Sequence, residues 1–235
     1  MERKAGNSSV ATIIAALNEA EGIGPTIEEL QRHVRDAYLL VVDGRSVDGT
    51  IEIAKNKGAA VLLQDGRGKG QAISQGIKQL PSNVRYVVFT DADFTYPAEY
   101  IPKMIEILDQ EPDVGMVIGN RFGSNLNFGK VSSNVFYLGN RFLAFAQHLV
   151  NGIKLLDPLS GLRIVRWEIL QGWQPKSKHF DVEAEMNYLI ERKGYEIREI
   201  PIVYRQRLGE KKLKLRHGIV ILRRIISESL TSSKF

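Results

Sequence analysis

The chain has 235 residues, no cysteine and a formal net charge of +5. This length allows one large α/β domain with a full hydrophobic core. The missing thiols exclude disulfides and thiolate metal sites. No apolar run reaches the roughly 18 residues that a membrane-spanning helix needs. Residues 1–9 are polar and unlike a secretory signal, so we expect the protein on the cytoplasmic side.

The excess positive charge is concentrated near the C-terminus. Between Arg205 and Arg224 there are eight Lys or Arg residues against one acid, Glu210. Such a cluster is typical of a site for phosphates, an anionic membrane surface or nucleic acid. A solvated basic surface explains the charge alone equally well. The cluster lacks interleaved aromatic residues that could stack on bases, so we expect no nucleic-acid partner.

In the first half of the chain, short apolar strands alternate with helical segments. Strands are expected at 10–16, 38–43, 60–63, 85–90 and 114–118, and helices at 25–35, 47–57, 70–79 and 97–110. This alternation predicts βαβ units, and therefore an α/β fold with a mostly parallel sheet flanked by helices on both faces. Ligands of such sheets bind beyond the carboxyl ends of the strands.

Two segments in the second half are apolar with basic residues at their edges. Residues 131–153 include a very apolar helix, and there is no acid anywhere between 114 and 156. Residues 216–235 carry Leu and Ile at i, i+4 and i+7 beside several arginines. Both patterns are typical of amphipathic helices in a membrane interface. For 131–153, a helix in the protein core is an equally good explanation.

The pair Asp91 and Asp93 ends the apolar strand 85–90. Side chains at i and i+2 of an extended segment point the same way, so the two carboxylates can converge. Two adjacent anions are costly without a cation between them, and Mg²⁺ or Mn²⁺ carrying a diphosphate fits. A lone pair of this kind is more often two solvated loop acids. Acids at other strand ends, Glu19 and Asp43, favour a binding site.

Six motifs, taken in order, resemble those of one enzyme family. Leu17-Asn18-Glu19, the run 42–50 and Asp91-Ala92-Asp93 follow the order seen in family 2 glycosyltransferases of the GT-A (Rossmann-like) fold. The segments 157–163, 180–183 and 207–213 resemble the dolichol-phosphate (polyprenyl-phosphate) mannose and glucose synthases. The resemblance covers about residues 10–215. It implies a GT-A catalytic domain over 1–215, including the helix 131–153, followed by an amphipathic interface helix over 216–235.

The resemblance implies an inverting hexosyltransferase. It would move mannose or glucose from GDP-mannose or UDP-glucose to dolichol or polyprenyl phosphate, and the motifs do not separate the two sugars. Asp91 and Asp93 would hold Mg²⁺ or Mn²⁺ against the leaving diphosphate, and Asp93 and Arg207 are the expected catalytic residues. The expected contacts of the nucleotide sugar are Leu17, Glu19, Asp43, Lys69 and Asp91. We expect Ser46 and Asp48, rather than Asp43, to cap the helix that follows them.

A lipid monophosphate is already ionised near pH 7, since its second pKa is about 6. It therefore needs positioning by basic side chains rather than a general base. The expected acceptor-phosphate residues are Arg121, Lys130, Arg207 and Lys212. We expect a peripheral protein at the cytoplasmic face of a membrane. Many relatives carry transmembrane helices after the catalytic domain, so a membrane-protein partner, or a missing transmembrane segment of a longer chain, is also considered.

Two alternatives stay open. A family 2 transferase that extends a glycan or polysaccharide would attack with a neutral hydroxyl and need a base, for which Asp157, Asp181 and Glu183 are candidates. Against this, we expect Asp181 to cap a helix and Asp157 to pair with Arg163. A non-catalytic membrane-surface module would use the basic C-terminus, but it has no use for acids aligned at strand ends.

Overall fold

The computed structural model describes residues 9–123, 135–210, 212 and 216–232. These residues form a seven-stranded sheet of order β3-β2-β1-β4-β6-β5-β7, in which β6 is antiparallel to both neighbours and the other pairs are parallel. The predicted mostly parallel sheet is confirmed. The strands are β1 (Val10–Ala16), β2 (Tyr38–Asp43), β3 (Ala60–Leu63), β4 (Tyr86–Asp91), β5 (Val114–Asn120), β6 (Arg163–Arg166) and β7 (Glu196–Pro201).

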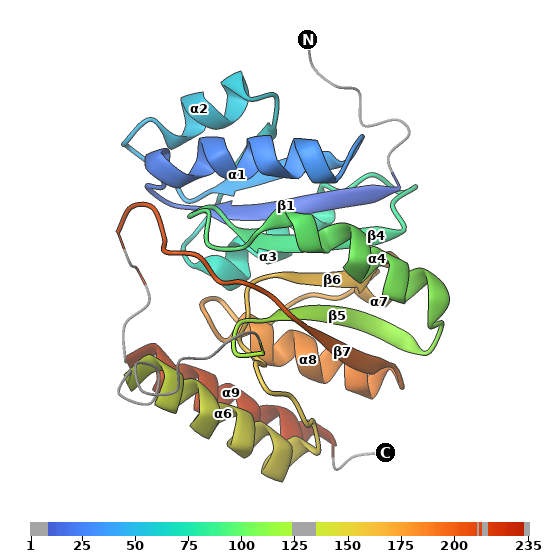
Figure 1. Cartoon of the computed structure of the whole chain (residues 1–235). Helices are drawn as coiled ribbons and strands as arrows, with labels where there is room; N and C mark the ends of the chain where they lie inside the picture. Colours follow the sequence, from blue (N-terminus) through green and yellow to red (C-terminus); the bar gives the residue numbers. More distant parts are fainter. Residues whose placement is uncertain (1–8, 124–134, 211, 213–215, 233–235) are drawn as a thin grey trace.

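Helices cover both faces of the sheet (Figure 1). One face carries α1 (Ala20–His33), α2 (Thr50–Asn56), the 3₁₀ turn η1 (Ala98–Tyr100) and α4 (Ile101–Gln110). The other carries α3 (Lys69–Lys78), α7 (Trp167–Leu170) and α8 (Val182–Arg192). Two longer helices, α6 (Val135–Asn151) and α9 (Arg216–Ser232), lie side by side at one end of the molecule.

Alternate residues of each central strand enter different cores. Ile14 pairs with Val41 and both belong to the core under α1, while Ile13 pairs with Leu40 in the core under α3. A strand buried on both faces needs a continuous apolar run, as the sequence of β2 shows. Each such fully buried side chain contributes roughly 1.5–3 kcal/mol to the free energy of folding. A shift by one residue would move these side chains to the other face, so the register of the central strands is strongly specified.

The first two helices begin at other residues than predicted. Helix α1 starts at Ala20 and contains Pro25, where the sequence pattern indicated a start. The earlier start is stabilised from the next loop, since Thr50 Oγ1 accepts the N–H of Glu19 and Asp48 accepts that of Ala20. Helix α2 starts at Thr50 instead of residue 47. The residues before Thr50 form a loop, in which Asp48 accepts the N–H groups of Ala20 and Thr50.

Helices α6 and α9 pack against each other and against α8. Leu143 of α6, Ala184 of α8 and Ile225 of α9 share a small core. The opposite face of the pair is apolar and exposed: Phe142, Phe145 and Leu149 of α6 and Ile219 and Leu230 of α9 are all at least 59% exposed. The helix α6 is therefore a core helix on one side only. In the part of the chain described, no helix is long and apolar enough to cross a membrane. The division at residue 215/216 stays a prediction.

Candidate active site

The carboxyl ends of β1, β2 and β4 bring the predicted donor-side residues to one edge of the sheet. In the register, Ala16 of β1 lies opposite Asp43, and its neighbour Ala15 lies opposite Asp91. The strand order reverses between β1 and β4, since β2 and β3 extend to one side of β1 and β4 lies on the other. Such a switch point leaves a crevice where nucleotides bind in doubly wound sheets. Glu19 and Asp93 follow the two strands that flank it.

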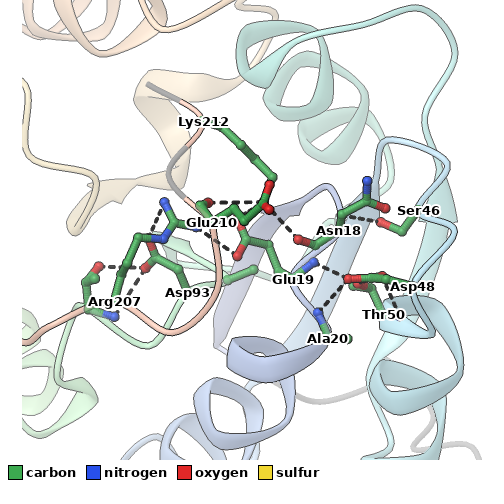
Figure 2. A network of polar contacts seen from close by, with 12 residues as sticks. Asn18, Glu19, Ala20, Ser46, Asp48, Thr50, Asp93, Arg207, Glu210 and Lys212 are labelled. Carbon is green, nitrogen blue, oxygen red and sulfur yellow. Dashed lines mark hydrogen bonds and ion pairs between the residues drawn. The ribbon is translucent and has the colours of Figure 1, made fainter. Parts of the chain in front are cut away.

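The loops after β1 and β2 are joined by polar contacts, several of which Figure 2 shows. Asp43 is fully buried and accepts hydrogen bonds of 2.7 Å from both the N–H and the hydroxyl of Ser46. The Ser46 oxygen in turn accepts the N–H of Asn18. Asp48 accepts the N–H of Thr50, the first residue of α2, but it is not the cap residue that the sequence indicated, because the N-cap position is Gly49 and no side chain caps it. Ser46 does not cap α2, because its hydroxyl is engaged by Asp43 and Asn18.

The two carboxylates of the acidic pair have different surroundings. The Asp91 side chain is 30% exposed, whereas that of Asp93 is 10% exposed and accepts bonds from the N–H and hydroxyl of Thr95. Burial, and then the charge of Asp91, raise the pKa of Asp93 above its ordinary value. The charge of Arg207 and the hydrogen bonds from Thr95 oppose this rise, but burial outweighs them.

Three basic side chains lie against these acids. Lys69 Nζ is 2.5 Å from Asp91 Oδ1. Arg207 Nη2 is 2.8 Å from Glu19 Oε1, and its Nη1 is 3.4 Å from Asp93 Oδ2. Lys212 Nζ is 2.7 Å from the same Glu19 oxygen (Figure 2). Burial raises the pKa of Glu19, although hydrogen bonds from Lys212 and Arg207 oppose that shift.

The two C-terminal cations reach the site because the chain after β7 returns across the sheet (Figure 1). The N–H of Leu208 donates to the carbonyl of Asp93 at 3.0 Å, and the N–H of Arg205 donates to that of Thr95 at 3.0 Å. Arg205 also forms a bidentate pair with Glu29 of α1, with both N–O distances 2.7 Å. These backbone and side-chain contacts hold residues 205–210, and with them Arg207, at the switch point.

The acidic pair suits one hard divalent cation. No group of three acidic or histidine side chains that could hold a metal is found among the described residues. Mg²⁺ is commonly held by one or two carboxylates together with substrate phosphates and water, and two carboxylates satisfy that pattern. The Nε of Arg207 is buried without a hydrogen-bond partner in the described structure, which gives the site a donor available to a phosphate oxygen. The residues present therefore fit a metal–diphosphate group.

Arg121, at the end of β5, forms a bidentate pair with the fully buried Asp157, and both N–O distances are 2.7 Å. Its guanidinium also lies over the Tyr204 ring. The predicted pair between Asp157 and Arg163 is wrong. Arg163 is buried and donates instead to the carbonyls of Pro158, Ser160 and Glu183 and to the side chain of Asn187.

The remaining predicted residues have mixed outcomes. Lys130 lies outside the described residues. Leu17 is 44% exposed beside the switch point. Asp181 lies at the first position before α8, but its side chain makes no cap hydrogen bond, so the expected capping role is wrong; its carboxylate pairs with Arg224 of α9 at 3.0 Å. Glu183 pairs with Lys69 at 2.7 Å.

Sequence reasoning missed residues that support the site from a distance. Glu199 of β7 accepts the N–H groups of Leu156 and Asp157 through its two carboxylate oxygens, and thereby fixes the partner of Arg121. Burial raises the pKa of Glu199. The phenol oxygen of Tyr96 accepts the N–H of Gly161 at 2.7 Å. No local pattern marks these residues, because each acts on a segment far away in the sequence.

The strand order, the switch point and the acidic pair together define a doubly wound α/β protein with an acidic site beyond the carboxyl ends of its central strands. A solved structure of glucosyl-3-phosphoglycerate synthase from Mycobacterium tuberculosis, in complex with Mn²⁺, UDP-glucose and glycerol 3-phosphate, superposes with a TM-score of 0.73. The match covers 97% of this chain and 80% of that one at 24% identity, so it concerns the fold alone.

Sequence comparison names the family. The sequence model of glycosyl transferase family 2 matches residues 11–173, and the chain belongs to this family. A dolichyl-phosphate hexose transferase of Haloferax volcanii is 33% identical over 208 residues, which cover 87% of this chain and 86% of the relative. A dolichol-phosphate mannosyltransferase of Pyrococcus furiosus is 30% identical over 223 residues, covering 87% of this chain and 59% of the relative. The resemblance predicted from the six motifs is confirmed.

Proposed function

We propose that this glycosyltransferase moves a hexose from a nucleotide sugar to dolichol or another polyprenyl phosphate. The observation that carries the proposal is the group of Lys69, Arg207 and Lys212 around Asp91, Asp93 and Glu19 at the switch point. A reaction between two phosphate-bearing substrates needs many cations near one metal site. The names of the relatives from Haloferax volcanii and Pyrococcus furiosus support the same acceptor class.

On the donor side, Asp91 and Asp93 would hold Mg²⁺ or Mn²⁺, which supplies Lewis-acid stabilisation of the leaving diphosphate. Asp43 and Leu17 line the edge where the nucleoside would lie, and Glu19 holds Arg207 and Lys212 in place. Arg207, held between Glu19 and Asp93, would lie beside the diphosphate and use its unpartnered Nε for the acceptor phosphate. Direct displacement at the anomeric carbon by the acceptor inverts configuration.

On the acceptor side, the lipid phosphate is the nucleophile. Its charge at neutral pH removes the need for a base, so Arg121, Lys130, Arg207 and Lys212 would bind and orient it. The three candidate bases are all engaged by cations: Asp157 by Arg121, Asp181 by Arg224 and Glu183 by Lys69. This supports a phosphate acceptor over a glycan hydroxyl.

The exposed apolar face of α6 and α9 is proposed to lie in the interface of the membrane that contains the lipid. Phe142, Phe145 and Leu149 project from α6, and Ile219 and Leu230 from α9. Exposed apolar side chains on two helices that pack together, with arginines on the same helices, are typical of interfacial helices. The protein would then act at the cytoplasmic face, where nucleotide sugars are available.

The test is transfer with two donors in parallel. Purified protein is incubated with polyprenyl phosphate in detergent or vesicles and with labelled UDP-glucose or GDP-mannose. The expected result is an organic-extractable, acid-labile product from one donor, which also identifies the sugar. The variant Lys103→Ala is a surface control, since Lys103 pairs with the exposed Glu106 of the same helix, α4. Label found only in water-soluble glycan would contradict the proposal.

A further inference from the structure

Lys69 bridges two carboxylates at the candidate metal site. Its Nζ is 2.5 Å from Asp91 Oδ1 and 2.7 Å from Glu183 Oε1. The Lys69 and Glu183 side chains are 12% and 6% exposed, while the Asp91 side chain is 30% exposed. Burial by itself would lower the pKa of Lys69, but the charges of Asp91 and Glu183 raise it, so the ammonium is charged. One of its two partners is thus a proposed metal ligand, and the other lies deeper in the protein.

The backbone holds Lys69 and Glu183 at this separation. Lys69 is the first residue of α3, and Glu183 lies in the first turn of α8. The N–H of Gly70 donates to the carbonyl of His179 at 3.1 Å, which joins the start of α3 to the segment before α8. A Cβ on Gly70 would lie 2.2 Å from the carbonyl oxygen of Ser177, so this approach requires glycine. Because the backbone is fixed there, the ammonium can move only by a rotation of the Lys69 side chain.

A divalent cation at Asp91 competes with the ammonium for the same carboxylate oxygen. Displacing Lys69 without offering another anion would leave a buried, uncompensated charge, which is strongly unfavourable. Glu183 removes this penalty, because it stays bound to Lys69 when Asp91 is taken. The ammonium then remains beside the metal site, within reach of the phosphates that a metal would bring.

We propose that Glu183 is a positioning residue that retains Lys69 while a divalent cation replaces the ammonium on Asp91. Glu183 thereby acts as the second anchor of an exchangeable lysine and not as a general base. The inference deepens the proposed function, on which it rests for the metal at Asp91. It predicts that the effect of Glu183 on metal binding depends on the presence of Lys69.

The experiment is a titration of the full chain with Mn²⁺ alone, followed by electron paramagnetic resonance of the free ion. Four proteins form a double-mutant cycle: the unchanged protein, E183Q, K69M and the double variant. We expect E183Q to weaken Mn²⁺ binding about tenfold when Lys69 is present and by less than about threefold in the K69M background. K69M alone should bind Mn²⁺ more tightly than the unchanged protein, because no ammonium has to be displaced. E191Q, at an exposed position of the same helix, is the control and should change nothing.

Equal weakening by E183Q in both backgrounds would mean a general charge effect and would overturn the inference, as would no weakening in either. Thermal unfolding of each variant is measured alongside. If E183Q does not fold, the test uses K69M alone. The inference is overturned if K69M binds Mn²⁺ no more tightly than the unchanged protein does. The titration uses neither sugar donor nor lipid. Its failure is therefore distinguishable from a failure to transfer hexose to polyprenyl phosphate.

Discussion

The proposed donor side and the proposed acceptor side of this site are built differently. On the donor side, Asp43 and Asp91 end β2 and β4, the two parallel neighbours of β1, and Asp93 follows β4, so the sheet itself brings them together. On the acceptor side, Arg121, Arg207 and Lys212 depend on ion pairs with residues far away in the sequence. The residues of the first side are thus held in place by the order of the strands, and those of the second side by their ion pairs. The two kinds of construction should respond differently to substitution.

The largest effect is expected on the topological side. Asp93→Ala removes one of the two carboxylates proposed to hold the metal, so transfer should fall by about 10³-fold or more. The fold should persist, because the strands around Asp93 are held by their apolar cores. Chelation of divalent metal should give the same loss. Initial rates and circular dichroism measure both properties, and Asp113→Ala at an exposed position is the control. Unchanged turnover would contradict the metal role.

Arg207→Ala tests the charge-paired side. A hydrogen bond to a charged group contributes about 1.5–3 kcal/mol, so kcat/KM for the lipid phosphate should fall roughly 10- to 100-fold. Binding of the nucleoside diphosphate should weaken much less. Kinetics with varied lipid and calorimetry with the nucleotide separate the two. Equal losses would show that Arg207 serves the donor as much as the acceptor.

A smaller effect is expected where the protein would meet the membrane. Replacing Phe142 and Phe145 by serine removes two exposed rings without opening the core, since both are about 60% exposed. Binding to vesicles with anionic lipid should weaken about tenfold. Moving a Phe side chain from water into an apolar environment contributes roughly 1.5–3 kcal/mol to binding, and each substitution removes part of that free energy. Transfer to a short, water-soluble polyprenyl phosphate should be kept. Leu63→Ser, at an exposed position of β3, is the control in co-sedimentation. Unchanged vesicle binding would contradict the proposal that α6 and α9 bind the membrane.

The smallest effect concerns stability. The pKa of Asp93 is raised in the folded protein, so its ionisation destabilises the fold as pH rises from the ordinary carboxyl range through the folded pKa. Asp93→Asn removes that cost. In metal-free buffer at pH 7 it should unfold a few degrees higher than the unchanged protein, and the difference should vanish well below the ordinary Asp pKa of about 3.9, where Asp93 is protonated in both the folded and the unfolded state. A stabilisation that is independent of pH would point to another cause.

The alternation of strands and helices was sufficient to predict the sheet, its mostly parallel order and the edge that carries the acids. These features follow from local apolar periodicity and from the rule that parallel strands end at one edge. The antiparallel β6, inserted between β4 and β5, and the strand β7 were not predicted. Their short, partly charged sequences resemble loops: Arg163–Arg166 becomes a strand buried between β4 and β5, while Glu196–Pro201 pairs with β5 at the edge of the sheet and stays partly exposed.

The sequence by itself thus determined the α/β class, the family and the acids at the strand ends, because each depends on residues that are near neighbours in the chain. Only the tertiary structure decided which cation meets which acid. Asp157 pairs with Arg121 and not with Arg163, and Lys69 lies between Asp91 and Glu183. Ion pairs form by distance and burial across separate elements, and a chain with 32 basic and 27 acidic residues offers too many combinations for sequence to resolve.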